Sequence, residues 1–215
     1  MVGKLLMLLC DVGNTSYAFY KDGESYKEFV ADFDISSVKE EVYYICVNPK
    51  VSPKLKKNPL WKDVSPMITL QGSYDSLGID RKLAISVLDS GVIVDAGSAI
   101  TVDVIEDGLY QGGFIFPGFV AMQNSFKQIS SKLDYLLNFE VSLDKIAKNS
   151  QDAISYGAFV PLITEIKRLS TGKKLIITGG DGKFLAKHLD GSVYEPNWLF
   201  DAMKKIINAS KGQQC

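Results

Sequence analysis

The chain has 215 residues, enough for one large or two small domains with a sizeable core. Its 24 basic and 25 acidic side chains give a formal net charge of -1, so no global field attracts nucleic acid or an anionic membrane. Three cysteines without C-x-x-C spacing argue against a disulfide framework, and a single histidine, His188, argues against a zinc cluster or a Ser-His-Asp triad. We therefore expect a cytoplasmic protein whose partners are small molecules or other protein chains.

Apolar runs and turn residues divide the first half of the chain into strands and short helices. The opening apolar run is shorter than a signal-peptide core and continues directly into Asp11, which argues against export. Asp22-Gly23 is expected to join two strands as a hairpin, and Asn48-Pro49 to end a buried strand. Strands are expected over residues 5–10, 16–21, 25–30, 42–47 and 67–70, and helices over 35–41, 50–57 and 79–88.

The second half repeats this scheme with longer elements. Asp107-Gly108 is again a hairpin turn, and Asn149 or Ser150 can cap a long helix in which Pro161 can introduce a kink. Residues 134–148 lack a clear period and are expected to form a mobile loop with a short strand. Strands are expected over 92–94, 99–106, 109–116 and 175–177, and helices over 121–133, 152–169, 182–188 and 198–207. The order is roughly βββαβα twice, which predicts a duplicated α/β fold with mixed sheets.

One short motif occurs at the start of both halves. In each copy an apolar run leads to an aspartate, a glycine two residues later and then a hydroxyl-bearing residue, in Asp11-Val12-Gly13-Asn14-Thr15 and in Asp95-Ala96-Gly97-Ser98-Ala99. Glycine lets backbone amides approach an anion, and the carboxylate can hold a metal ion that a phosphate also contacts. Turn chemistry alone also selects Asp and Gly, but two copies in matching contexts favour phosphate-binding loops.

Five motifs in chain order resemble the motif series of type III pantothenate kinases, within the actin, hexokinase and Hsp70-like ATPase superfamily. They occupy residues 11–15, 78–81 (Gly-Ile-Asp-Arg), 95–103, 112–118 and 178–181 (Thr-Gly-Gly-Asp). The resemblance implies two ribonuclease-H-like halves, expected over residues 1–88 and 89–215, with the ATP site in the cleft between them. It also implies ATP-dependent phosphorylation of pantothenate to 4'-phosphopantothenate, the first step of coenzyme A synthesis.

The resemblance also implies roles for individual residues. Asp80 resembles the general base that takes the proton of the pantothenate hydroxyl, and Arg81 can hydrogen-bond an anionic substrate. Asp11 is expected beside the ATP phosphates and their divalent cation, Mg²⁺ or another, and Asp95 is expected to bind a monovalent cation, K⁺ or NH₄⁺. Ser98 stands where the family more often has Thr, and its hydroxyl can still bond a phosphate oxygen. The expected nucleotide-binding residues are Asp11, Val12, Gly13, Asn14, Thr15, Ser16, Ser98, Gly179 and Gly180, and the expected substrate-binding residues are Tyr74, Gly78, Ile79, Asp80, Arg81 and Ser150.

Simpler explanations exist for several of these residues. Asp80 can be an ordinary first-turn carboxylate, Tyr74 a surface aromatic residue and Ser150 a plain helix cap. At the level of function, the alternatives are another small-molecule kinase or phosphatase of the same superfamily, or a non-catalytic ATP-binding regulator. The presence of both Asp11 and Asp80 argues against the regulator. Because family members are homodimers, the resemblance implies a homodimer, and the near-zero net charge argues against nucleic-acid and membrane partners.

Overall fold

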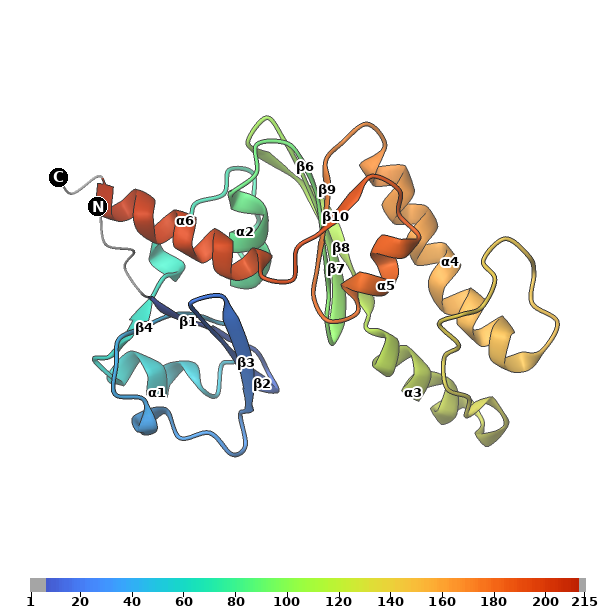
Figure 1. The fold of residues 1–215 in the computed structure, drawn as a ribbon, viewed down its shortest axis with the longest axis horizontal. Helices are drawn as coiled ribbons and strands as arrows, with labels where there is room; N and C mark the ends of the chain where they lie inside the picture. Colours follow the sequence, from blue (N-terminus) through green and yellow to red (C-terminus); the bar gives the residue numbers. More distant parts are fainter. Residues whose placement is uncertain (1–6, 213–215) are drawn as a thin grey trace. The chain divides into compact units, whose positions relative to one another are not determined.

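The computed structural model describes residues 7–212, which divide into two compact units (Figure 1). The first unit comprises the chain up to Val87 and again from Asn197, and the second comprises Leu88–Pro196. The strand expected over 5–10 therefore lies partly outside the described residues. Each unit has its own buried apolar core.

The two units contain five-stranded mixed sheets of identical topology. The strand orders are β3-β2-β1-β4-β5 and β8-β7-β6-β9-β10, so corresponding strands occupy corresponding positions. In each sheet the first three strands pair antiparallel, the fourth pairs in parallel with the first, and the fifth pairs in parallel with the fourth. The predicted α/β duplication is confirmed. The strands are β1 (Leu8–Val12), β2 (Ser16–Lys21), β3 (Glu24–Phe29), β4 (Val42–Cys46), β5 (Trp61–Asp63), β6 (Gly91–Ala96), β7 (Ala99–Glu106), β8 (Leu109–Pro117), β9 (Leu175–Thr178) and β10 (Ser192–Tyr194).

In the first unit, strand alternation sends side chains to two separately covered faces. Leu8, Cys10 and Val12 lie on the face that packs against α1 (Ser52–Lys57), whereas Leu9 lies on the opposite face. That opposite face is covered by two helices, α2 (Ile79–Ser86) and α6 (Trp198–Gly212), as Figure 1 shows. A sheet covered on both faces explains why β1 begins as an apolar run, Leu8–Cys10, rather than as an alternation of apolar and polar residues.

The last helix packs in the first unit, although the expected second half, 89–215, included it. Phe200, Met203 and Ile207 of α6 are buried in the same cluster as Leu9 and Leu83. The indole Nε1 of Trp198 also donates a hydrogen bond of 2.8 Å to the carbonyl of Ala84. The chain thus returns to its first unit after completing the second.

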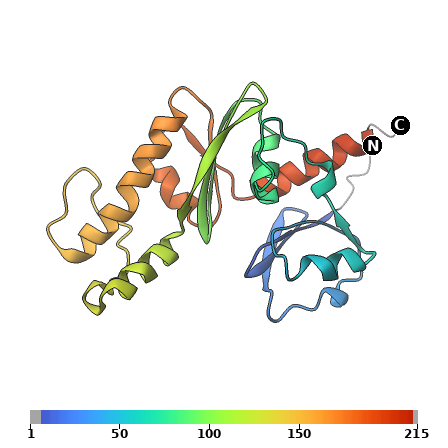
Figure 2. The same ribbon diagram turned by 180° about the vertical axis from the view of Figure 1, so that it is seen from behind.

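The second unit contains three α-helices, two of which precede β9 in the chain while the third lies between β9 and β10. α3 (Phe119–Ile129) continues directly from β8, and α4 (Ser150–Ser170) and α5 (Gly182–Lys187) pack against the sheet (Figure 2). Their apolar residues, including Phe159 and Leu185, share a core cluster with Val94. The predicted long helix is therefore confirmed.

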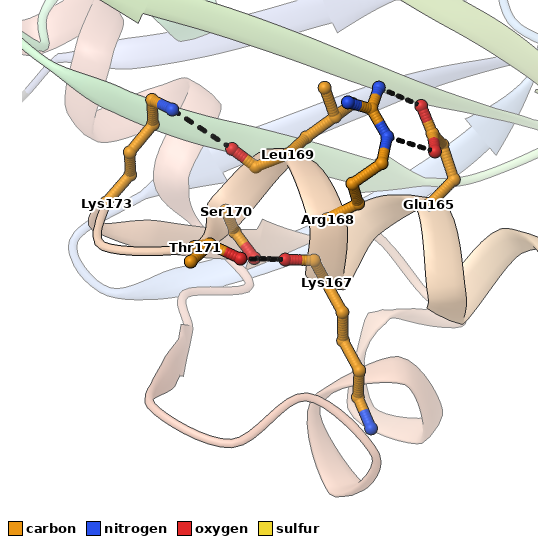
Figure 3. Close-up of polar contacts among 7 residues, drawn as sticks. All are labelled: Glu165, Lys167, Arg168, Leu169, Ser170, Thr171 and Lys173. Atoms are coloured by element: carbon orange, nitrogen blue, oxygen red, sulfur yellow. Dashed lines mark hydrogen bonds and ion pairs between the residues drawn. The ribbon is translucent and has the colours of Figure 1, made fainter.

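The end of α4 is fixed by local hydrogen bonds, which Figure 3 shows. The hydroxyls of Ser170 and Thr171 donate to the carbonyl of Lys167, and Arg168 makes a bidentate pair with Glu165 at 2.6 and 2.8 Å. The two hydroxyl contacts satisfy the Lys167 carbonyl, one of those that a helix end leaves without an intrahelical partner. Although α4 has 21 residues, no helix in the part of the chain that the structure describes is long and apolar enough to cross a membrane.

Some predicted elements were wrong. The helix expected over 35–41 is only a 3-10 turn at Ile35–Ser37, because the Asp34 side chain accepts from Ser36 N and the chain is extended at Val38. No strand lies within 67–70, since a 3-10 turn with Pro66 at its centre occupies Ser65–Met67 and residues 68–70 after it are irregular. The strand is instead Trp61–Asp63, whose Trp61 is buried and pairs with Val42. The short strand expected within 134–148 is absent, and β10 was not predicted.

Candidate functional site

The β1–β2 loop is a tight turn that exposes two polar side chains. Asp11 is partly buried near the end of β1, and Gly13 N donates a 2.9 Å hydrogen bond to Ser16 O, which closes the loop. Asn14 and Thr15 at the tip are exposed, and Thr15 O accepts from Val30 N at 3.0 Å. The loop is therefore held by the strands on either side while its tip faces solvent.

A further residue, Asn48, contacts this loop. It is 5% exposed and follows β4, and its Nδ2 donates to the carbonyls of Gly13 and Asn14, both at 3.3 Å. The sequence marked Asn48-Pro49 only as the end of a strand. Its contact with the loop depends on the parallel pairing of β1 and β4, which single-sequence patterns do not specify.

Asp11 and the start of α2 lie on the same face of the first unit's sheet. Asp11 pairs across the sheet with Ala18 on one side and Ile45 on the other, and cross-strand partners point to one face. Ile45 belongs to the buried cluster against which both Ala18 and Ile79 of α2 pack. The structure thus places this carboxylate on the side of the sheet that carries the Gly-Ile-Asp-Arg motif.

The motif at 78–81 forms the start of α2 and orients two charged side chains. Gly78 occupies the N-cap position, and its carbonyl accepts from Lys82 N at 2.9 Å. Asp80 Oδ1 accepts a 2.8 Å hydrogen bond from Arg81 N. Arg81 is only 7% exposed, and its Nη1 donates to the hydroxyl of the exposed Tyr74 at 3.1 Å. Tyr74 and Arg81, which the sequence placed in one substrate site, are therefore in contact.

In the second unit, the loop after Asp95 is enclosed by two other segments. Asp95 lies on β6 between Thr101 of β7 and Thr178 of β9. Asp181 N donates to Ala96 O at 3.0 Å, and Gly118 N donates to Ser98 O at 3.2 Å. The Gly-Gly turn and the β8–α3 junction thus both touch the loop, and burial raises the pKa of the Asp181 carboxyl above its ordinary value.

Two glycines are required by these close approaches. Gly179 has φ +86°, and a Cβ there would overlap the carbonyl of Ala96 and lie 2.6 Å from Asp95 Oδ1. A Cβ on Gly118 would overlap the Ser98 carbonyl and lie 2.5 Å from Gly97 O. Only glycine allows such contacts between backbones. The sequence reading missed this role of Gly118, although Pro117-Gly118 lies within a motif.

Ser150 lies in a different setting. It is exposed as the first residue of α4, and the capping hydrogen bond comes from Asn149, whose side chain accepts from Asp152 N at 2.9 Å. Figure 1 shows this end of α4 beside the loop of residues 134–149, and Gln151 Nε2 donates to Leu136 O there at 3.0 Å. Ser150 is thus not the helix cap, and the residue is exposed to solvent.

Two further features that could mark a site within residues 7–212 are a cluster of metal-binding side chains and a reactive thiol. No group of three or more histidine, cysteine, aspartate or glutamate side chains is placed there to hold a metal ion. Burial raises the pKa of the thiols of Cys10 and Cys46, which opposes formation of a reactive thiolate.

Two surface cavities lie away from the predicted site residues. One, of about 210 Å³, is lined in the first unit by Tyr43, Met67 and Ile207 among others. The other, of about 380 Å³, lies in the second unit at the end of α4, beside Lys167 and Thr171. Neither lining includes a residue of the five motifs, so these cavities do not locate the site.

Comparison with known proteins supplies the family. A sequence model described as type III pantothenate kinase matches residues 35–171. The type III pantothenate kinase of Sulfurimonas denitrificans is 47% identical over 201 residues, covering 94% of this chain and 97% of the relative. That of Campylobacter hominis is 40% identical over 207 residues, covering 96% and 100%.

A solved structure extends the similarity to three dimensions. The crystal structure of a protein from Campylobacter jejuni, named as a conserved Baf family transcriptional activator, has 37% identity and a TM-score of 0.89. The match covers 96% of this chain and 100% of that one. Together with the curated relatives, it confirms the resemblance carried by the five motifs. This chain belongs to the type III pantothenate kinase family.

Proposed function

We propose that this chain transfers the γ-phosphoryl group of ATP to pantothenate, giving 4'-phosphopantothenate and ADP, with Asp80 as the general base. The observation that carries the proposal is the 47% identity to a type III pantothenate kinase across 94% of the chain. The pantothenate hydroxyl loses its proton to Asp80 while its oxygen bonds to the γ-phosphorus. The bond from that phosphorus to the bridging oxygen breaks, and ADP leaves.

The β1–β2 loop is proposed to bind the ATP phosphates through Asp11, Asn14 and Thr15, with Val12, Gly13 and Ser16 shaping the turn. Mg²⁺ commonly binds one or two carboxylates plus substrate phosphates and keeps several waters. A single partly buried carboxylate, Asp11, fits this preference. When bound, the cation neutralises charge on the phosphate oxygens.

Pantothenate is proposed to bind at the start of α2. Its carboxylate matches the planar, permanently charged guanidinium of Arg81, which Tyr74 already contacts at 3.1 Å. Gly78 and Ile79 bring the Asp80 carboxylate to the same segment. The exposed Ser150 is proposed as a further substrate contact.

The loop of the second unit is proposed to bind a monovalent cation at Asp95, with Ser98, Gly179 and Gly180 contacting the nucleotide. The Asp95 carboxylate and the neighbouring backbone carbonyls are oxygen donors, which suit K⁺. Replacing K⁺ and NH₄⁺ in the buffer by Na⁺ is therefore expected to lower the rate of ADP release several-fold. In the Asp95→Asn variant, the rate of ADP release should no longer depend on K⁺. Equal rates with and without K⁺ or NH₄⁺ would contradict the role of Asp95.

A coupled ADP-release assay with ATP, Mg²⁺, K⁺ and pantothenate tests the function directly. We expect ADP production that depends on pantothenate. A folded protein that binds Mg-ATP but releases no ADP with pantothenate would contradict the proposal. If the protein binds Mg-ATP but releases no ADP with any acceptor, it would be a non-catalytic regulator; the Campylobacter jejuni structure is named as a transcriptional activator. Turnover with an acceptor other than pantothenate would indicate a different kinase of the superfamily.

We also propose a cytoplasmic homodimer without a nucleic-acid partner. Several large apolar side chains of the second unit are more than two-thirds exposed, namely Val120, Ile129, Leu136 and Ile146. A contiguous apolar patch marks a protein interface, and all four of these side chains lie within residues 120–146. Sedimentation velocity would give the mass of the assembly, and a monomer at assay concentrations would contradict the dimer.

A further inference from the structure

We infer that Asn48 is a positioning residue for the nucleotide, because its buried amide fixes the conformation of the β1–β2 loop. This inference rests on the proposed binding of ATP phosphates by that loop. Asn48 is not part of the five motifs, and it lies more than 30 residues along the chain from the loop that it contacts. Its place in the fold brings it there.

The position of Asn48 follows from the parallel pairing of β1 and β4. Val12 pairs with Cys46 at the end of the ladder, and Val47 N donates to Val12 O at 3.0 Å. Beyond this bond the two strands separate. The Asn48 side chain then continues the connection, since its Nδ2 reaches the next two carbonyls, those of Gly13 and Asn14.

The orientation of the amide is determined by its partners. Asn48 Oδ1 accepts a 3.0 Å hydrogen bond from Lys50 N, so the amide oxygen must face the turn before α1. The two hydrogens on Nδ2 then face the loop, where both partners are carbonyl oxygens. Because Asn48 is 5% exposed, water cannot easily replace this donor.

These contacts determine where the loop amides point. In a trans peptide the C=O and N–H bonds point in opposite directions. When the carbonyls of Gly13 and Asn14 face Asn48, the N–H groups of Asn14 and Thr15 therefore point away from it. Successive N–H groups held in a turn form an anion-binding concavity. Asn48 thus fixes the direction of two donors suited to phosphate.

Two variants separate this role from the role of Asn48 in the turn before α1. Asn48→Asp keeps an oxygen for Lys50 N but replaces the donor by a charged acceptor facing two carbonyls. Asn48→Ser can also accept from Lys50 N, as serine does in such turns, but its shorter side chain withdraws from the loop. The matched control is Asn58→Ala, which removes a similar side-chain acceptor for Leu60 N at 3.0 Å in the same unit.

The readouts are the Kd for Mg-ATP by calorimetry, the separate KM values for ATP and pantothenate, and the thermal unfolding midpoint. We expect Asn48→Asp to raise the Kd and KM for ATP about tenfold or more, from loss of two hydrogen bonds and added repulsion. Asn48→Ser should raise the Kd and KM for ATP by a smaller factor, because serine adds no negative charge beside the two carbonyls. The KM for pantothenate should stay unchanged in both variants, and all constants should stay unchanged in Asn58→Ala.

Direct nucleotide binding distinguishes failure of this inference from failure of the proposed function. If the unmodified protein binds Mg-ATP without phosphorylating pantothenate, the proposed function fails and the Kd values still decide the role of Asn48. A folded Asn48→Asp variant with an unchanged Kd overturns the inference, as does an equal rise in both KM values. Unfolding of both Asn48 variants would assign the residue to the fold alone, and an unmodified protein that binds no Mg-ATP would remove both proposals.

Discussion

Replacing Asp80 by Asn is expected to lower kcat by about 10²–10⁴-fold, the usual contribution of a general base. Asparagine has nearly the same shape but cannot accept the hydroxyl proton. The fold should tolerate the change, because the Asn Oδ1 can still accept the 2.8 Å hydrogen bond from Arg81 N. Loss of a charge in the first turn of α2 costs about 0.3–1 kcal/mol.

The rate should be measured by ADP release at saturating ATP and pantothenate, with the thermal midpoint as a check of folding. Asp75→Asn is the matched control, since Asp75 is an exposed carboxylate in the segment that leads to α2. It should keep the kcat of the unmodified protein. The Kd for Mg-ATP should be unchanged in Asp80→Asn, and near-full turnover by that variant would refute the assignment of the base.

Local turn chemistry explains why much of the fold could be predicted. Asp22 and Gly23 have φ of 54° and 98°, and Asp107 and Gly108 have φ of 50° and 73°. Positive φ at two successive residues is the conformation that Asp-Gly favours in two-residue hairpins. The antiparallel strands beside these turns were therefore predictable, and β2 begins and ends where its alternation indicated, at Ser16–Lys21.

Elements that depend on distant partners were not predictable in this way. β5 and β10 have only three residues each, too few for a clear period, and both are edge strands that pair in parallel. Trp61 becomes a strand residue because it is buried beside Tyr44, with ring centroids 5.8 Å apart. α6 likewise packs against residues such as Leu9 and Leu83, from which the whole second unit separates it in the sequence.

The same distinction applies to the candidate site. The order of the motifs was enough to name Asp11, Asp80 and Asp95 as candidates, and the structure places Asp11 and Asp95 near the ends of β1 and β6 and Asp80 in the first turn of α2. The motif order could not show that Asn48 contacts the first loop. Nor could it show that Gly118 approaches the second loop, since both contacts join segments far apart in sequence.

Replacing Gly179 by Ala is expected to destabilise the second unit by about 2–5 kcal/mol. A left-handed conformation costs an alanine about 1–2 kcal/mol. Overpacking adds about 1–3 kcal/mol, because the new Cβ would overlap the backbone carbonyl of Ala96, which cannot rotate away as a side chain can. Urea unfolding, monitored by circular dichroism, would measure the decrease in the free energy of unfolding.

Gly180→Ala is the matched control for stability. A Cβ on Gly180 meets no atom within 4 Å, and its φ is not positive, so its urea midpoint should stay close to that of the unmodified protein. An unchanged midpoint for Gly179→Ala would contradict the close approach of the turn to the Asp95 loop.

The activity of the folded fraction of Gly179→Ala tests whether the close approach of Gly179 to Ala96 and Asp95 also supports the proposed cation site. Relief of the overlap requires Ala96 and the adjacent Asp95 to move, since the new Cβ would also lie 2.6 Å from Asp95 Oδ1. We therefore expect the remaining activity to respond less to K⁺ than that of Gly180→Ala. Full K⁺ stimulation at a lowered midpoint would instead show that Gly179 serves stability alone, and that the cation site tolerates displacement of its loop.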